Sequence, residues 1–239
     1  FYHPSNMILF VVGSVDPDVM MKQIKQNQSK KKFDIPRPVH RYFLEEPNPV
    51  AQKRNEICLS VGIPKCLFGF KEKGVALNKT GKEALKQELE TEVVLEALLG
   101  TSSNIYQNLY DEGLIDDGFG SDYALEINYG FTMIGGDTQD PDELLKRIEN
   151  ELRPIVSKGI SETEFERVRK KKIGSYLKAF NSPEWIANQY TSYRFKETDV
   201  FQIIPILEKI HVDDVNQRMR EHFDWNQFAA SIVLSKEKL

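Results

Sequence analysis

The sequence predicts an α+β fold: a mixed, largely antiparallel sheet backed by helices on one face and preceded by a separate strand–helix unit. Two observations support this prediction. Strands and helices are expected in the order β-β-α-α-β-β, followed by several helices and a final strand, and helices segregated after paired strands are typical of α+β domains. In addition, the strands expected at residues 119–127 and 129–134 are joined by a tight connection, which indicates an antiparallel pair.

The first expected element is a strand at residues 7–12, an apolar run long enough for one buried strand. Asp16 then provides an N-cap, and Pro17 occupies the first position of a helix. This unit is too small to bury its own apolar face. We therefore expect residues 1–28 to be the terminal strand and helix of a preceding domain missing from this sequence. The strand is expected to pair with an exposed sheet edge or with another molecule.

Residues 29–52 are expected to form a linker. This stretch contains four prolines, which remove backbone donors that helices and sheets need. They are Pro36, Pro38, Pro47 and Pro49. The main domain is then expected at residues 53–239.

Two kinds of signal predict the elements of the main domain. Short apolar runs predict strands at residues 56–61, 66–71, 119–127, 129–134 and 228–234. Apolar residues at helical spacing predict helices at residues 82–99, about 103–111, 140–158, 161–180, 183–195, 198–210 and 213–222. The caps expected for the last five helices are Asp140, Ser161, Ser182, Thr198 and Asp213.

The composition is that of an ordinary globular protein. Hydrophobic residues make up 40% and charged residues 28% of the 239 residues, which suits one large domain or a domain with an appendage. The net charge of −4 provides no electrostatic argument for nucleic acid binding. No run of about 18 apolar residues predicts a membrane span. We therefore expect neither nucleic acid nor a membrane as a partner.

Cysteine usage favours a cytoplasmic protein. Cys58 and Cys66 lie on neighbouring predicted strands and lack the spacing of a metal or redox motif. We interpret them as reduced core thiols, with a disulfide between them as the alternative. The apolar start also lacks the basic region and cleavage site of a signal peptide.

Several charged residues need an interpretation. The helix at residues 82–99 carries five glutamates, interpreted as a solvated face, with remnants of an acidic site as the alternative. They are Glu83, Glu88, Glu90, Glu92 and Glu96. The basic runs at residues 30–32 and 167–172 are interpreted as solvated positive faces. His211 and His222 are expected at a helix start and a helix end, where imidazolium interacts favourably with the helix dipole.

Six segments, in a consistent order, resemble the C-terminal half of insulinase (pitrilysin) family peptidases. They are residues 2–18, 98–103, 106–114, 159–165, 182–184 and 210–215. The first is similar to the family's Tyr-x-Pro-x-Asn-Met strand and its Gly-x-Val-Asp-Pro helix start. The resemblance is to the bacterial, Bacillus-type processing-protease-like members, which carry two homologous domains in one chain.

This resemblance implies a zinc enzyme whose inverted His-x-x-Glu-His motif lies on the first helix after the opening strands. The corresponding helix here, residues 82–99, contains no histidine. The resemblance therefore implies that zinc belongs to a missing N-terminal half, and that this chain has no catalytic or metal-binding residue.

In active relatives the second half donates an Arg and a Tyr to the substrate backbone. Here Gly130 and Phe131 stand where the Arg is expected, and Glu143 stands near the Tyr position. Asn128 and Tyr129 are the local substitutes, and we regard them as candidate substrate-binding residues.

Two functions are consistent with these observations. In the first, the chain is the noncatalytic half of a zinc metalloendopeptidase. It closes a proteolytic chamber and helps to bind peptides or unfolded polypeptides, but it is inactive alone. In the second, it is an inactive structural or binding subunit beside an active homologue. The expected partners are accordingly a polypeptide substrate and either the N-terminal half of the same protein or that homologue.

Overall fold

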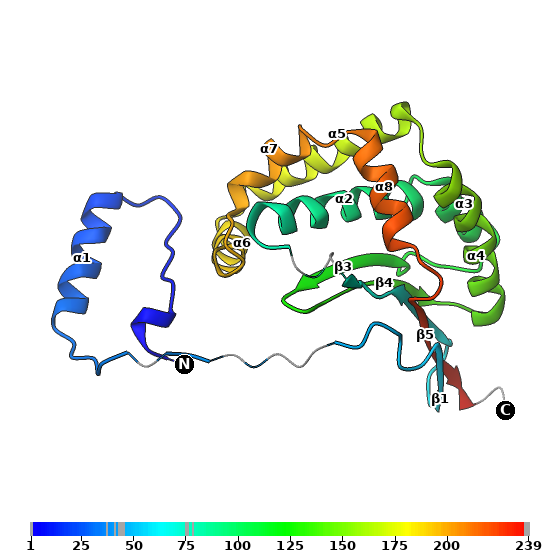
Figure 1. Ribbon diagram of the computed structural model, residues 1–239, viewed down its shortest axis with the longest axis horizontal. Helices are drawn as coiled ribbons and strands as arrows, with labels where there is room; N and C mark the ends of the chain where they lie inside the picture. Colours follow the sequence, from blue (N-terminus) through cyan, green and yellow to red (C-terminus); the bar gives the residue numbers. More distant parts are fainter. Residues whose placement is uncertain are drawn as a thin grey trace.

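The computed structural model describes residues 2–36, 38–40, 42, 46–74, 77 and 79–236. From β1 onward its strands and helices follow the predicted order (Figure 1). They are η1 (Pro4–Asn6), α1 (Pro17–Ser29), β1 (Arg54–Leu59), β2 (Lys65–Phe70), α2 (Gly81–Leu99), α3 (Asn104–Asp111), β3 (Gly120–Glu126), β4 (Tyr129–Asp137), α4 (Pro141–Lys158), α5 (Glu162–Ala179), α6 (Pro183–Phe195), η3 (Val200–Gln202), α7 (Ile203–Leu207), α8 (Val212–His222) and β5 (Phe228–Ser235).

The five strands form one sheet in the order β1-β5-β2-β4-β3. β1 and β5 run parallel, and the other neighbouring strands run antiparallel. The sheet is therefore mixed and largely antiparallel, as predicted. The tight connection between β3 and β4 makes an antiparallel pair in which Glu126 faces Tyr129.

Strand order corrects the expectation for the two cysteines. β5 lies between β1 and β2, so Cys58 and Cys66 do not lie on adjacent strands. Both thiols are free. Only Cys66 is a core thiol, and burial raises its pKa to about 12, whereas Cys58 is exposed. β1 and β2 follow each other in the sequence but are not adjacent in the sheet, because β5, from the C-terminal end of the chain, lies between them.

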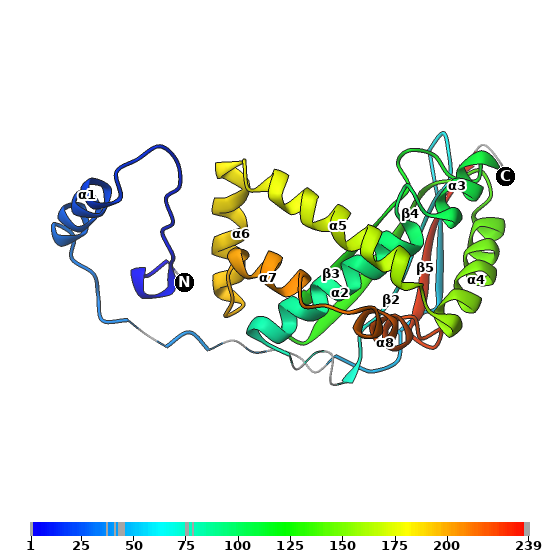
Figure 2. The same cartoon turned by 90° about the horizontal axis from the view of Figure 1, so that it is seen from above.

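Helices cover one face of the sheet. Figure 1 shows α2, α5, α7 and α8 on one side of it, and Figure 2, seen from above, shows α2 and α5 running across the strands. Along β4 the buried residues Thr132 and Ile134 face the helices, whereas Tyr129, Phe131 and Met133 are exposed. Buried and exposed side chains alternate along a strand in this way when only one face of its sheet is covered.

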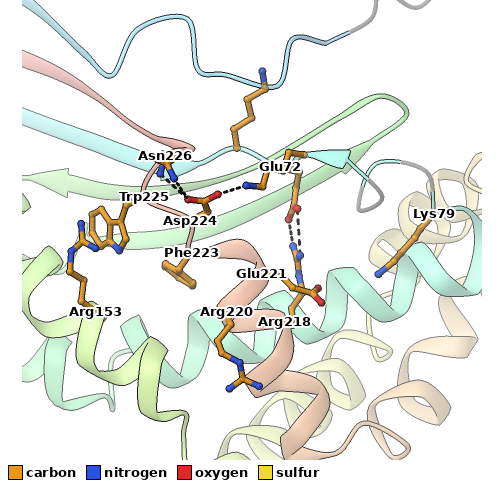
Figure 3. Close-up of a pocket in the computed structure, with 12 residues that line it drawn as sticks. Glu72, Lys79, Arg153, Arg218, Arg220, Glu221, Phe223, Asp224, Trp225 and Asn226 are labelled. Carbon is orange, nitrogen blue, oxygen red and sulfur yellow. Dashed lines mark hydrogen bonds and ion pairs between the residues drawn. The ribbon is translucent and has the colours of Figure 1, made fainter.

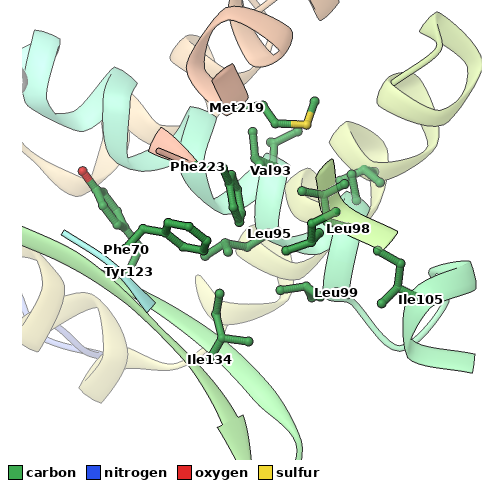
Figure 4. Packing of buried hydrophobic residues seen from close by; sticks show 14 of the residues in the cluster. Phe70, Val93, Leu95, Leu98, Leu99, Ile105, Tyr123, Ile134, Met219 and Phe223 are labelled. Atoms are coloured by element: carbon green, nitrogen blue, oxygen red, sulfur yellow. The ribbon is translucent and has the colours of Figure 1, made fainter. Parts of the chain in front are cut away.

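The core lies between this covered face and α2. Leu89 and Val93 of α2 and Ile134 of β4 are fully buried. Figure 4 shows how side chains from the sheet, α2 and α8 meet in this layer, with Phe70 and Phe223 packed against each other. Their ring centroids are 4.8 Å apart in an edge-to-face arrangement.

Local capping signals predict the start of most helices correctly. The side chains of Asp140, Ser161 and Ser182 cap α4, α5 and α6 by accepting a hydrogen bond from the backbone N–H three residues on. Each also precedes a proline or a glutamate at the first helical position.

Two predicted helices differ in detail from the structure. The helix predicted at residues 198–210 is replaced by η3 and the short α7, and Asp199, not Thr198, is the cap of η3. A helix starting at residue 198 would place Pro205 in its interior, where a backbone donor is needed. α8 begins one residue earlier than expected, with His211 as its N-cap instead of Asp213.

The N-terminal unit agrees with the prediction only in its helix. Asp16 caps α1 through bonds from the N–H groups of Asp18 and Val19. The structure has no strand at residues 7–12, and this segment pairs with no sheet edge among the described residues, so pairing within the chain is wrong; pairing with another molecule stays a prediction. A strand requires the backbone groups of a partner. Phe10 instead stacks on Tyr190 of α6, with ring centroids 4.1 Å apart.

In the described part of residues 31–52, the chain has no helix or strand (Figure 1). This agrees with the proline-rich composition of the segment. The assignment of residues 1–28 to a preceding domain stays a prediction.

Candidate functional site

The uncovered face of the sheet carries large apolar side chains. Leu67 of β2 and Tyr129, Phe131 and Met133 of β4 are 41–47% exposed. They line one cavity of about 630 Å³, which is bounded on another side by residues of the segment 46–52. We call this cavity, with its lining, the open-face groove. Contiguous exposed apolar surface of this kind marks binding sites in globular proteins.

Small residues form the floor of the open-face groove. Gly69 of β2 and Ala229 and Ser231 of β5 line it between the larger side chains. A Cβ on Gly69 would lie 1.8 Å from the carbonyl oxygen of Thr132, so no side chain fits there. Because Gly69, Ala229 and Ser231 have a small side chain or none, they leave the space above the strands unfilled.

The structure separates the two residues predicted to bind substrate. Tyr129 lies on the open face and stacks on Phe131, with ring centroids 6.3 Å apart. Asn128 lies in the β3–β4 turn with φ of 74° and lines a different cavity of about 460 Å³, beside Lys196 of the turn after α6. Only Tyr129 contributes directly to the open-face groove.

Sequence reasoning missed the neighbours of Tyr129. The alternation along residues 129–134 could have placed Phe131 and Met133 on the same face as Tyr129. In contrast, no local signal could show that the segment 46–52 borders the same groove.

The covered face carries a buried charged cluster of Glu72, Arg218, Tyr123, His222 and Thr132, which we call the Glu72 cluster. Figure 3 shows its Glu72–Arg218 pair. Arg218 of α8 donates to the Glu72 carboxylate, and both side chains are almost inaccessible to solvent. Tyr123 donates its hydroxyl to the same carboxylate at 3.0 Å. His222 Nδ1 lies 2.7 Å from Glu72 Oε1, and its Nε2 lies 3.1 Å from Thr132 Oγ1.

His222 in this cluster is neutral, so the expected imidazolium at a helix end is wrong. Burial, and then the charge of Arg218, lower the pKa of His222 well below its ordinary value. One tautomer fits: Nδ1–H donates to Glu72, and Nε2 accepts from Thr132, whose Oγ1 in turn accepts from the N–H of Phe70 at 3.0 Å. Burial lowers the pKa of Arg218 to about 10, so the guanidinium remains charged at neutral pH.

A second, charged cavity of about 850 Å³ opens beside the Glu72 cluster (Figure 3). Lys73 pairs with Asp224 here, and the Arg153 guanidinium lies 4.4 Å from the centre of the Trp225 ring. Most of its charged groups already have partners, which makes it a weaker candidate than the open-face groove.

The glutamates of α2 do not form a solvated face. Glu88 accepts from the Tyr193 hydroxyl at 2.8 Å, and Glu92 accepts from the Tyr176 hydroxyl at 2.7 Å. Burial raises the pKa of Glu88. Glu88 and Glu92 therefore connect α2 to α6 and α5, whereas Glu83 is exposed, as a solvated face requires.

The basic run at residues 167–172 is also paired. Lys171 lies 2.5 Å from Glu96, and Lys172 lies 2.6 Å from Glu92. The interpretation of this run as a solvated positive face therefore holds only in part: Arg167 and Lys170 are exposed, whereas Lys171 and Lys172 pair with glutamates of α2.

The donor set of the described residues does not fit a zinc ion. Among them, no group of three His, Cys, Asp or Glu side chains is placed to hold a metal. His222 is engaged in the Glu72 cluster, and His3 bonds to Ser5 and to the carbonyl of Asp34. No helix in the described part of the chain is long and apolar enough to cross a membrane.

Comparison with known proteins agrees with this fold. Residues 1–172 match the family described as "Peptidase M16 inactive domain". The chain is 42% identical over 236 residues to the "uncharacterized zinc protease YmfH" of Bacillus subtilis, covering 99% of this chain and 54% of that protein. The chain therefore spans about half the length of this relative.

Solved structures give the same result. A candidate M16-like peptidase from Alicyclobacillus acidocaldarius superposes with a TM-score of 0.88 at 32% identity, over 94% of this chain and 53% of that one. A protease from Helicobacter pylori superposes with a TM-score of 0.78 at 16% identity, over 93% of this chain and 53% of that one, and shows the fold alone. The chain belongs to the M16 (insulinase) peptidase family, as its inactive C-terminal domain.

Proposed function

We propose that this chain is the noncatalytic half of a zinc metalloendopeptidase, and that its open-face groove forms one wall of the chamber in which a polypeptide substrate is held. The observation that carries the proposal is the exposure of Leu67, Tyr129, Phe131 and Met133 around one cavity. A polypeptide with apolar side chains would cover this surface, which otherwise stays in contact with water.

The proposed organisation places residues 1–28 at the end of the catalytic half, residues 29–52 in the linker and residues 53–239 in the inactive domain. The coverage of 54% of the Bacillus relative is consistent with a second half of similar length. Zinc and the catalytic base would then belong to the other half, and this chain would contribute binding and enclosure. We further propose a cytoplasmic location, with which the exposed free thiol of Cys58 is consistent.

Tyr129 and Asn128 would have different roles in this function. The Tyr129 side chain lines the open-face groove, where its hydroxyl could donate to a peptide carbonyl. Asn128 tolerates the positive φ of the turn and so positions Tyr129, without lining that groove.

Binding of a labelled, 12-residue apolar peptide to residues 1–239 tests this function. We expect Phe131→Ser to raise the Kd roughly tenfold or more, because it removes an aromatic side chain from the centre of the binding surface. Leu177→Ser is the matched control, since Leu177 is 56% exposed but lies on α5, outside the open-face groove. An equal effect of the two substitutions would contradict the proposal.

A second candidate, an inactive binding subunit beside an active homologue, is favoured by one observation. Where active relatives are expected to present an arginine, Gly130 has no space for a side chain: a Cβ there would lie 2.9 Å from the Glu72 Cγ. Phe131 faces the groove with an apolar ring. Peptide cleavage by the full-length protein alone would reject this candidate, whereas cleavage only with an added homologue would support it.

A further inference from the structure

Lys71 lies at one end of the open-face groove. It follows Leu67 and Gly69 on the same side of β2 and forms a bridge with Phe131 of β4. Its backbone N–H donates to the Gln227 carbonyl at 3.0 Å, which fixes its position at the end of the sheet. Its side chain is only 19% exposed.

The Lys71 ammonium group already forms an ion pair with a carboxylate. Lys71 Nζ lies 2.6 Å from Glu46 Oε1 and also donates to the Pro47 carbonyl. Glu46 and Lys71 are the only charged residues among the described residues that line the groove. Among the described residues of the open-face groove, Lys71 is therefore the side chain that binds a negative charge, here the Glu46 carboxylate.

Lys71 and Glu46 differ in how strongly the fold fixes their positions. Lys71 is held at the end of β2 by the sheet, whereas Glu46 belongs to the proline-rich segment before β1, whose described part has no helix or strand, and its side chain is 42% exposed. Because the Glu46 carboxylate is partly in water, another carboxylate can replace it beside Lys71 at small cost in free energy. A lysine partly removed from water among apolar groups still requires an anion.

The charges near Lys71 favour such an exchange. Lys71 also lines the charged cavity beside the Glu72 cluster, whose lining carries more cations than acids. Two of these acids, Glu72 and Asp224, are already paired with Arg218 and Lys73.

We propose that Lys71 is a specificity residue of the open-face groove that binds a carboxylate of the peptide, and that Glu46 occupies its place in the free protein. The carboxylate is either the C-terminus of the peptide or an Asp or Glu side chain. This proposal rests on the proposed function, since it needs a peptide in the groove. It adds a preference: apolar peptides with a carboxylate at one end bind more tightly than neutral ones.

Three peptides with the same apolar sequence test the proposal. One has a free C-terminal carboxylate, one a C-terminal amide, and one an amide together with a single added Glu. Affinities for residues 1–239 are measured by fluorescence anisotropy. We expect Glu46→Gln to tighten binding of a carboxylate-bearing peptide about 3- to 10-fold, in the range of one charge-assisted hydrogen bond, and to leave the neutral peptide unchanged. The first and third peptides distinguish a terminal from a side-chain carboxylate.

Substitutions of Lys71 complete the test. Lys71→Met should abolish the preference for a carboxylate, whereas Lys71→Arg should retain it. The matched controls are Lys65→Met and Asp137→Asn: this ion pair, at 2.5 Å, involves the opposite end of β2 and does not line the groove. Thermal unfolding of every variant checks that the fold persists, and the retained preference of Lys71→Arg excludes a general folding defect.

The outcomes separate the two proposals. If all three peptides bind equally and Glu46→Gln changes nothing, the role of Lys71 is rejected while the open-face groove stands as a peptide site. If the Lys65→Met and Lys71→Met variants lose affinity alike, the role of Lys71 is rejected as well. If no peptide binds to any variant, the proposed function is rejected, and the role of Lys71 with it.

Discussion

The two faces of the sheet differ in which side chains they bury: charged groups are buried on the covered face, and apolar groups are exposed on the open face. On the covered face, Thr132 supports a fully buried cluster that contains a carboxylate, a guanidinium and an imidazole. On the open face, its neighbours Phe131 and Met133 leave aromatic and aliphatic groups in contact with water. This difference indicates that the two faces have separate roles. The covered face holds the sheet and the helices together, and the open face is available to a ligand.

The largest expected effect comes from breaking the Glu72 cluster. Arg218→Met should lower the free energy of unfolding by about 3–5 kcal/mol, because the Glu72 carboxylate would remain buried without its cation. Urea denaturation followed by circular dichroism measures this. As a comparison, Lys65→Met breaks an exposed pair and should cost about 0–1 kcal/mol. Equal costs would mean that the cluster is not a structural centre.

A pair of neighbours on β4 provides the next test. Ile134→Ala on the covered face should lower the free energy of unfolding by about 2–5 kcal/mol, since Ile134 is fully buried. Met133→Ala on the open face, where the side chain is 47% exposed, should cost only about 0.5 kcal/mol. Similar losses for both variants would show that the open face is also needed for stability.

A smaller effect is expected from pH. Because the pKa of His222 is lowered in the folded protein, the unfolded chain binds a proton below about pH 6.5 that the folded chain does not bind. Stability from this group is therefore complete above about pH 6.5 and is lost as the pH falls, by at most about 1.4 kcal/mol per pH unit.

Urea denaturation of the protein and of His222→Gln at pH 7.5 and 5.5 measures this loss. The difference between the two pH values should be smaller in the variant. An unchanged difference would show that His222 is not the group that titrates.

The sequence predicts those parts of the fold that depend on local chemistry. Asp140, Ser161 and Ser182 cap helices through bonds within one turn, so their neighbours in sequence suffice to identify them. The strand expected at residues 7–12 does not form within the chain for the opposite reason, since a strand depends on a partner that local sequence does not specify.

The candidate site is only partly predictable for the same reason. Tyr129 could be identified from the resemblance and Phe131 from alternation along one strand. The contact between Lys71 and Glu46 depends on how a distant segment crosses the sheet. The neutral state of His222 likewise depends on burial beneath Glu72 and Arg218, which charge patterning along α8 does not reveal.

The central claim is that the open face serves binding and not stability. The most direct test is to measure urea unfolding and peptide affinity on the same preparation of Phe131→Ser. We predict a free energy of unfolding within about 0.5 kcal/mol of the unmodified protein, together with a Kd raised roughly tenfold or more. An unchanged Kd, or a loss of stability comparable to that of Ile134→Ala, would contradict the account.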